Sequence, residues 1–170
     1  MVGIPYVGSG PLAHSLALDK VVAKIIFREH GLPTPDFAVL NDPNFDAPGL
    51  SYPLIVKPKN EAVSMGIRIV NTEAELREAA QVIFNKFQQA VLVEQYIEGR
   101  EIYVSVLGND RLATFPILEM DFGKMPDDQY RIATAKVKWD EAYQQRIDVT
   151  VHPIKELDPA IERWAFHAAV

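Results

Sequence analysis

The sequence contains no cysteine among its 170 residues. This absence excludes a disulfide framework, a cysteine-ligated metal and a cysteine nucleophile. The sequence also lacks a run of about 18 apolar residues, the length that a membrane-spanning helix needs. Its first residues have neither a basic start nor a long apolar stretch, so they do not resemble a signal peptide. We therefore expect a cytoplasmic protein that has no membrane partner.

Basic side chains are in the minority. The chain has 17 lysine and arginine residues against 23 aspartate and glutamate residues, a formal net charge of −6. This balance argues against a general nucleic-acid binder, although a local basic cleft is compatible with it. The composition is otherwise globular, with 48% hydrophobic and 24% charged residues. A chain of this length can bury a core in one domain or in two small lobes.

Helix and strand signals alternate along the first hundred residues. Glycine and proline punctuate residues 1–13, which predicts a loop. Ser15 is a candidate cap for a helix that runs to about His30, and Gly31 and Pro33 are typical of its end. Short strands are predicted at residues 37–40, 53–57, 67–70 and 91–93, with polar loops at 41–51 and 58–66.

A capping box marks the best-defined helix. Thr72 is followed three residues later by Glu75, and apolar residues at helical spacing continue to about Phe87. The second half is predicted to contain strands at 102–107 and 112–118 joined by a hairpin turn at 108–111, a loose acidic stretch at 121–131, a strand at 136–139 and a helix that begins after Asp158. This mixture of helices with antiparallel hairpins predicts an α+β fold.

Three features of the first 66 residues suit a phosphate group. Lys57 closes the strand and is followed by Pro58, so a rigid element would hold its point charge. Lys20 lies next to Asp19 in the first predicted helix. The loop 59–66 is polar and ends on glycine, and such a loop can close over phosphates with backbone N–H groups and a hydroxyl. Solvated lysines and an ordinary hairpin loop explain the same patterns.

Two acids flank the turn after the strand at 91–93. Glu94 follows the strand, Gly99 turns the chain, and Glu101 heads the next apolar run. Backbone groups just after a strand can bond a purine ring, with Glu94 accepting from an exocyclic amine and Glu101 holding ribose hydroxyls. Two exposed glutamates on a solvent-facing hairpin are the alternative. The four histidines lie far apart, and no Ser-His-Asp arrangement is indicated.

Five segments in order resemble the ATP-grasp superfamily and, within it, the D-alanine–D-alanine ligase group. They are GIPYVGSG, LALDKVVAK, GLPTPDF, YPLIVKPKNEAVSMGI and VLVEQYIEGREIYVSVLG, and they cover most of residues 3–110. Further on, AKVKWDEAY resembles the segment with a phosphate-contacting lysine, where Lys138 is the better match and Lys136 the alternative. The resemblance implies an α+β ATP-grasp fold and a ligase that forms a C–N bond through an acyl-phosphate.

The resemblance also implies roles for single residues. ATP would be bound with Mg²⁺, and Ser64 is the candidate catalytic residue. The implied contacts are Lys20, Lys57 and Lys138 with the phosphates, Glu61 and Ser64 in a mobile loop over them, Glu94, Gln95, Tyr96 and Ile97 with adenine, and Glu101 with the ribose. The substrates would be amino acids or short peptides, the pathway peptidoglycan biosynthesis, and a homodimer is a possible assembly.

Two departures from the family pattern alter these expectations. The family loop usually reads Glu-Gly-Ser-Ser-x-Gly, whereas residues 61–66 read Glu-Ala-Val-Ser-Met-Gly. The lost glycine and hydroxyl are expected to change loop closure or the acceptor, so that D-alanine is not the expected acceptor. No metal ligand is assigned within the chain, because the family's late Asp and Glu-x-Asn are expected beyond residue 170.

The chain is therefore expected to be a fragment that binds the nucleotide but is inactive alone. The expected parts are a linker of an N-terminal domain at 1–14, the central ATP-grasp subdomain at 15–101 and an incomplete C-terminal subdomain at 102–170. A non-catalytic ATP-binding module, a remnant that no longer binds ATP, and a ligase for a different amino acid or peptide are the alternatives.

Overall fold

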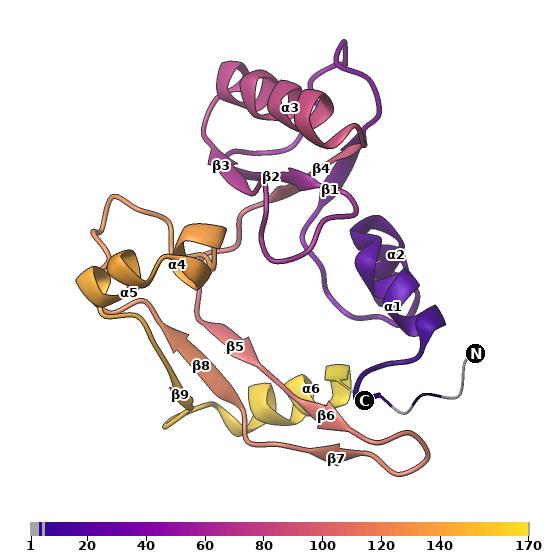
Figure 1. Cartoon of the computed structure of the whole chain (residues 1–170), viewed down its shortest axis with the longest axis vertical. Helices are drawn as coiled ribbons and strands as arrows, with labels where there is room; N and C mark the ends of the chain where they lie inside the picture. Colours follow the sequence, from indigo (N-terminus) through magenta and orange to yellow (C-terminus); the bar gives the residue numbers. More distant parts are fainter. Residues whose placement is uncertain (1–3, 5, 170) are drawn as a thin grey trace. The chain divides into compact units, whose positions relative to one another are not determined.

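The computed structural model describes residue 4 and residues 6–169 (Figure 1). The chain divides into two compact units, of which the first ends at Tyr96 and the second begins at Ile97. Each unit combines helices with antiparallel strands. The predicted α+β class is therefore confirmed.

A four-stranded antiparallel sheet forms the centre of the first unit, in the order β1-β4-β2-β3. Its strands are β1 (Phe37–Leu40), β2 (Leu54–Pro58), β3 (Arg68–Val70) and β4 (Val91–Gln95). The predicted strands are confirmed to within one or two residues. Val91, Leu92 and Val93 are all fully buried, so β4 is covered on both of its faces.

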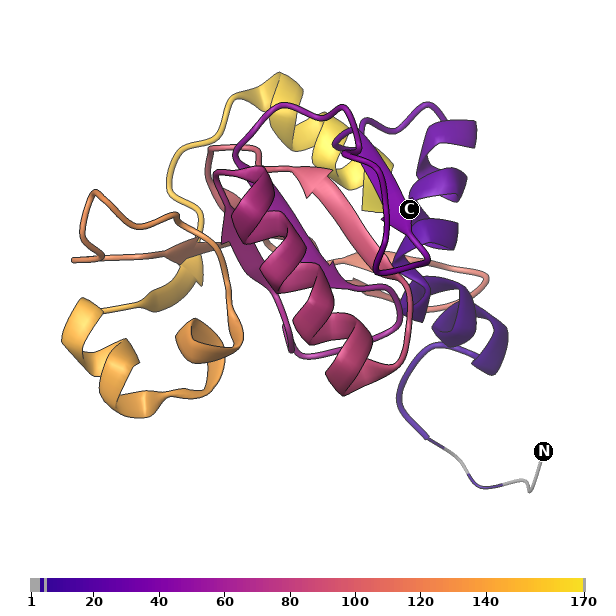
Figure 2. The same ribbon diagram turned by 90° about the horizontal axis from the view of Figure 1, so that it is seen from above.

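One long helix, α3 (Glu73–Phe87), lies across one face of this sheet in Figures 1 and 2. Thr72 caps it as predicted, because its hydroxyl accepts from the Glu75 N–H at 3.2 Å. The Glu75 carboxylate in turn accepts from the Asn71 N–H at 2.7 Å, closing the first turn. The helix buries Leu76, Ala79, Ala80 and Ile83 against Leu54, Val56, Val91 and Val93 of the sheet. Burial of each large aliphatic side chain contributes about 1.5–3 kcal/mol.

The single helix predicted from Ser15 is wrong, since the structure has two: α1 (Pro11–Leu18) and α2 (Lys20–Glu29). Pro11 starts α1 because its fixed φ and missing N–H suit a first helical position, so the predicted loop ends at Gly10. Residues 1–3 and 5 of that loop lie outside the described residues. Ser15 is inside α1 and donates to the Pro11 carbonyl at 2.9 Å. Asp19 is the residue that caps α2, accepting from two N–H groups at 3.1 Å.

Short strands and helices make up the second unit. Its three-stranded sheet has the order β5-β8-β9, and β6 pairs with β7. The strands are β5 (Glu101–Tyr103), β6 (Val106–Leu107), β7 (Ala113–Thr114), β8 (Leu118–Asp121) and β9 (Thr150–Pro153). Leu107 lies opposite Ala113, so the predicted hairpin at 108–111 is confirmed. The strand predicted over 102–107 is divided into β5 and β6.

Three helices complete the second unit: α4 (Ala135–Trp139), α5 (Glu141–Ile147) and α6 (Pro159–Ala169). The strand predicted at 136–139 is wrong, because the Thr134 hydroxyl accepts from the Val137 N–H at 3.3 Å and caps a helical turn there. Helix α5 and strand β9 were not predicted. Asp158 caps α6 as predicted, accepting from the Ala160 N–H at 2.6 Å. Within residues 6–169, no helix has the length and apolar character needed to cross a membrane.

Candidate functional site

A buried carboxylate lies between two lysines in the first unit. Glu94, on β4, is only 5% exposed. One of its carboxylate oxygens pairs with the ammonium of Lys57 on β2, and the other pairs with the ammonium of Lys24 on α2 at 2.8 Å. Lys24 is buried as well, at 6% exposed. The three charges therefore form a continuous Lys24–Glu94–Lys57 chain inside the unit.

The strand pattern explains why these charges meet. Side chains alternate between the faces of a sheet, and Val91 and Val93 pack on the α3 side, so Glu94 points to the opposite face. Glu94 lies directly across from Ile55, and Lys57 is two residues further along β2 on that same face. Such diagonal neighbours are within reach of long side chains. The sheet register thus brings Lys57 to Glu94, on the face away from α3.

Burial also determines the electrostatics of this chain of charges. A carboxylate taken out of water requires compensating charges, because an unpaired buried ion is strongly unfavourable. Burial lowers the pKa of Lys24, and its bond to Glu94 partly offsets that shift. Two ammonium groups share one carboxylate, so a net positive charge remains.

Lys20 adds a third ammonium group near Lys57. It is the first residue of α2, and its ammonium donates to the backbone carbonyls of Glu61 and, at 3.4 Å, Lys59. Burial and the charge of Lys57 both lower the pKa of Lys20. In the described part of the chain, no carboxylate forms an ion pair with Lys20. The excess of positive charge at this end of the sheet favours an anionic ligand.

The loop between β2 and β3 is fixed at its beginning. The Lys59 N–H donates to the carbonyl of Ala90 at 3.1 Å, and the Asn60 N–H donates to the side chain of Gln89 at 2.6 Å. The Glu61 carboxylate accepts from the other end of the Gln89 amide at 2.8 Å. Glu61 is therefore held by its neighbour in the unit, and its backbone carbonyl faces Lys20.

The middle and end of this loop have unusual backbone conformations. Val63 and Ser64 have positive φ angles of 52° and 60°, a region that non-glycine residues seldom adopt. Gly66 has φ +74°, and a Cβ there would lie 2.8 Å from the Pro58 side chain and 3.1 Å from Phe87. The Ser64 hydroxyl has no hydrogen-bond partner among the described residues, so it is available to a ligand.

The last residue of β4, Gln95, and the next residue, Tyr96, both use their backbone N–H groups within the first unit. The Gln95 N–H donates to the carbonyl of Asp36, and the Tyr96 N–H donates to the carbonyl of Pro53, both at 3.0 Å. These two N–H groups are therefore not available to a purine ring in this structure. Ile97 begins the second unit and is largely exposed.

Glu101 lies at the start of β5 in the second unit, where two groups hold its carboxylate. It accepts from the hydroxyl of Tyr103 and from the Ala133 N–H at 3.2 Å. Burial, together with the bond to Glu101, raises the pKa of Tyr103 above its ordinary range. The carboxylate is half-buried and is oriented by its neighbours.

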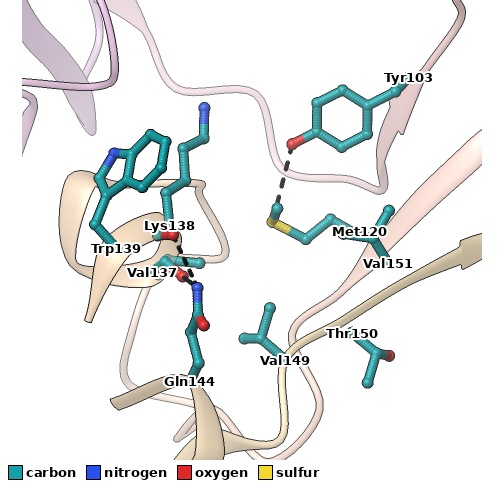
Figure 3. A pocket seen from close by; sticks show the side chains of 9 residues that line it. All are labelled: Tyr103, Met120, Val137, Lys138, Trp139, Gln144, Val149, Thr150 and Val151. Carbon is teal, nitrogen blue, oxygen red and sulfur yellow. Dashed lines mark hydrogen bonds between the residues drawn. The ribbon is translucent and has the colours of Figure 1, made fainter. Parts of the chain in front are cut away.

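Lys138 lines a cavity of about 410 Å³ in the second unit (Figure 3). The amide of Gln144 donates to the carbonyls of Val137 and Lys138 at 2.8 and 2.9 Å and so fixes the end of α4. In Figure 3 the Lys138 side chain extends away from Gln144, on the side of the Trp139 indole. The other wall is apolar and includes Tyr103, Met120, Val149 and Val151. Lys136, the alternative lysine, instead lies over the ring of Tyr143 at 4.3 Å.

The structure thus brings together Lys20, Lys57, Glu94 and the loop 59–66 within the first unit, and it places Glu101 and Lys138 in the second. The sequence prediction missed Lys24. A signal for it existed, because Lys24 is four residues after Lys20 and such residues share one helix face. Across residue 4 and residues 6–169, no group of three or more histidine and acidic side chains is arranged to hold a metal ion.

Comparison with known proteins identifies the family. The model of the family described as "D-ala D-ala ligase C-terminus" matches residues 26–168. A D-alanine–D-alanine ligase of Bordetella pertussis is 42% identical over 124 residues, which cover 71% of this chain and 39% of that protein. An uncharacterized protein of Sinorhizobium fredii, y4sG, is 41% identical over 124 residues, covering 73% of this chain and 37% of that protein.

Solved structures agree with this match. The D-alanine–D-alanine ligase of Bacillus anthracis has a TM-score of 0.73 at 26% identity, covering 99% of this chain and 51% of that one. The same enzyme complexed with ATP has a TM-score of 0.71 at 26% identity, covering 99% and 50%. The VanG D-Ala:D-Ser ligase of Enterococcus faecalis has a TM-score of 0.72 at 26% identity, covering 98% and 47%.

Fold and sequence together define an ATP-grasp domain of the ATP-dependent ligase class. The chain belongs to the D-alanine–D-alanine ligase family, within the region that the family model describes as the ligase C-terminus. The resemblance drawn from the five sequence segments is confirmed. The chain spans about half the length of the solved ligases and 37–39% of the two curated relatives.

Proposed function

We propose that this chain is the nucleotide-binding part of an ATP-dependent carboxylate–amine ligase. The observation that carries the proposal is the lysine cluster of the first unit: Lys24 and Lys57 pair with the buried carboxylate of Glu94, and Lys20 lies near enough to Lys57 for their charges to interact. Among the described residues, only one carboxylate forms ion pairs with these three ammonium groups, and phosphate groups would neutralise the positive charge that remains. The Bacillus anthracis relative has been solved in complex with ATP, which supports the same ligand here.

In the proposed reaction, a carboxylate oxygen takes the terminal phosphoryl group of ATP and ADP leaves. The nitrogen of an amine then attacks the acyl carbon of the acyl phosphate, and inorganic phosphate leaves as the C–N bond forms. Lys20 and Lys57 would hold the phosphates during transfer, with Lys138 as a further contact. The loop 59–66 would close over them, and the Ser64 hydroxyl would donate to a phosphate oxygen.

Glu101 would bind the ribose hydroxyls in this proposal. Its carboxylate is already oriented by Tyr103 and by the Ala133 N–H, so little side-chain freedom is lost on binding. The carbonyl groups of Gln95 and Tyr96 and the N–H of Ile97 are the candidates for contact with adenine. Mg²⁺ is expected to accompany ATP, but no step assigned to this chain depends on a metal ligand.

The substrates that we propose are amino acids or short peptides, in a cytoplasmic step of peptidoglycan biosynthesis. The family relatives already include ligases named for two different pairs, D-alanine with D-alanine and D-alanine with D-serine. Val63 replaces a hydroxyl residue of the usual loop and is exposed there. We therefore propose an acceptor other than D-alanine.

A calorimetric titration with ADP and with adenosine, with and without Mg²⁺, tests the proposal. The chain is expected to bind ADP, and Lys57→Ala is expected to weaken ADP more than adenosine. Lys86→Ala is the control, because Lys86 is an exposed lysine on α3 of the same unit. If Lys57→Ala loses equal affinity for ADP and adenosine, Lys57 does not contact the phosphates. If the unmodified chain does not bind ADP at millimolar concentration, the proposed function is rejected. A longer protein that contains this chain and a full ligase length could also be tested. If it binds ADP but forms no C–N bond, the chain would be a non-catalytic ATP-binding module.

A further inference from the structure

Both oxygens of Glu94 are occupied by ammonium groups, which bears on the role of this residue. Its side chain is 7% exposed, and Lys24 and Lys57 each take one oxygen. An exocyclic amine is a neutral donor and would have to compete with two charged donors. Charge-assisted hydrogen bonds are about twice as strong as neutral ones. Glu94 is therefore arranged as a counter-ion for the two lysines and not as the acceptor for the exocyclic amine of adenine.

Lys24 is the immobile member of the Lys24–Glu94–Lys57 chain. Its ammonium contacts the Thr34 hydroxyl and donates to the Pro35 carbonyl at 3.3 Å, in addition to its ion pair with Glu94. It also lies 5.1 Å from the centre of the Phe37 ring. Four partners hold this one group, two from the loop before β1, one from β1 and one from β4, and its side chain is 8% exposed.

Lys57 is at the other end of the Lys24–Glu94–Lys57 chain of ion pairs. Its side chain is 18% exposed, compared with 8% for Lys24. Its ion-pair partner is Glu94, so the position of the Lys57 ammonium depends on where that carboxylate is held. The buried Lys24 thus restrains the Glu94 carboxylate, and Glu94 in turn restrains the Lys57 ammonium. All three side chains belong to the first unit.

We infer that Lys24 is a positioning residue for the nucleotide site, which fixes the Glu94 carboxylate so that Glu94 holds the Lys57 ammonium at the phosphates. This inference rests on the proposed function, in which Lys57 contacts the phosphates of ATP. It assigns to Lys24 a role that requires no contact with the ligand. It also transfers recognition of adenine from Glu94 to the backbone of residues 95–97.

The decisive variant is the double substitution Lys24→Met with Glu94→Gln. It removes one positive and one negative charge, so the net charge of the cluster is the same as in the unmodified chain. Replacing a buried ion pair by neutral side chains of similar size is often compatible with folding. Long-range electrostatics alone would therefore leave ADP affinity unchanged, whereas loss of positioning lowers it.

Calorimetric titrations with ADP, adenosine and inosine diphosphate distinguish the explanations. We expect the double variant to bind ADP about tenfold more weakly, because a charged contact to the phosphates is misplaced. Adenosine affinity is expected to stay within about twofold. The preference for ADP over inosine diphosphate, which lacks the exocyclic amine, should not change. Lys86→Met is the matched control. Unchanged ADP affinity, or a lost preference for ADP, would overturn the inference.

A measurement without nucleotide separates this inference from the proposed function. Proton–nitrogen spectra of lysine ammonium groups detect those that exchange slowly because an ion pair holds them. The Lys57 signal is expected in the unmodified chain and in Lys86→Met, and it is expected to be lost in Lys24→Met. If the Lys57 signal persists in Lys24→Met, the positioning role is wrong even where ADP binds. If ADP does not bind the unmodified chain, the proposed function fails, while the spectra still decide the role of Lys24.

Discussion

The ion pairs of the two units differ in how deeply they are buried. In the first unit, Glu94 and Lys24 are buried at the sheet, where each depends on the other. In the second, Arg100 binds Glu119 through two contacts of 2.6 Å, but half of the Arg100 side chain is exposed. When one partner of an exposed ion pair is lost, water hydrates the charge that remains. Water cannot reach the remaining charge of a buried pair. Loss of one partner is therefore expected to cost more stability at the Lys24–Glu94 pair of the first unit than at the Arg100–Glu119 pair of the second.

The apolar side chains are also more deeply buried in the first unit than in the second. The first unit packs fully buried aliphatic side chains between its sheet and α3. The second unit has strands of two to four residues and leaves Trp139 and Trp164 64% and 46% exposed. These are the only two tryptophans of the sequence, and both belong to the second unit. Tryptophan emission therefore reports on the second unit, and far-UV circular dichroism reports on both.

The largest expected effect is the loss of Glu94. Glu94→Ala leaves Lys24 and Lys57 without their counter-ion and is expected to destabilise the first unit by about 3–5 kcal/mol. Denaturant unfolding followed by circular dichroism should show this loss, while the transition in tryptophan emission keeps its midpoint. Glu29→Ala, at an exposed position of α2, is the control and should change stability by less than about 0.5 kcal/mol. Similar losses in both variants would contradict the buried-charge assignment.

A smaller effect is expected for the carboxylate of the second unit. Glu101→Ala is expected to weaken nucleotide binding by about 1–3 kcal/mol, because charged hydrogen bonds to the ribose are lost. Calorimetric titration with ADP measures the change. Glu98→Ala removes an exposed carboxylate three residues earlier and should bind ADP as the unmodified chain does. An unchanged affinity in Glu101→Ala would reject the ribose contact.

Alkaline pH should affect the contributions of Lys20 and Lys24 in the first unit and of Tyr103 in the second with opposite signs. Lys20 and Lys24 have pKa values lowered from 10.5, so below that pH the unfolded chain binds more protons and the stability of the first unit rises with pH. Tyr103 has a pKa raised from 10.0, so above that pH the folded chain binds more protons and the stability of the second unit falls. Denaturation midpoints measured by the two optical signals test both signs. Lys24→Met should reduce the rise, and Tyr103→Phe should reduce the fall; parallel changes in all samples would contradict the assignment.

The smallest expected effect concerns two left-handed residues, one in each unit. Val63 has φ 52° and Asp148 has φ 59°. A left-handed conformation costs about 1–2 kcal/mol for most residues, but aspartate tolerates it because its side chain bonds locally. Val63→Gly is therefore expected to stabilise the first unit slightly, by less than about 1 kcal/mol after the added freedom of the unfolded chain is included. Asp148→Gly should be neutral. A thermal midpoint that rises in both variants or in neither would contradict this difference.

Local signals allowed much of the fold to be predicted. Thr72 with Glu75 predicted the start of α3, and residues 108–111 predicted the hairpin between β6 and β7, because a cap or a turn involves only neighbours in sequence. The failure at residues 136–139 is also local. There the cap from Thr134 outweighs the strand preference of Val137 and Trp139.

The candidate site was only partly predictable, because its central contacts join distant segments. The sequence indicated that Lys57 and Glu94 each lie at the end of a strand. It did not indicate that β2 and β4 are adjacent in a register that places the two charges on one face. Lys24 has the appearance of any helical lysine until α2 is packed against that face. A role that depends on pairing across 37 residues, as between Lys57 and Glu94, is a property of the fold.

The fixed ends of the loop 59–66 have a consequence for protein engineering. Lys59 and Asn60 are bonded to the chain before β4, and Gly66 tolerates no side chain because Pro58 and Phe87 lie against it. Glu61 is held as well, by Gln89 and Lys20, so the stretch from residue 62 to residue 65 can be exchanged between two anchored positions. Grafting the corresponding four residues of a relative, with Glu61 and Gly66 retained, would transfer a loop sequence while preserving both attachment points. Loop exchange on a constant lysine cluster would then test the proposal that this loop affects the choice of acceptor.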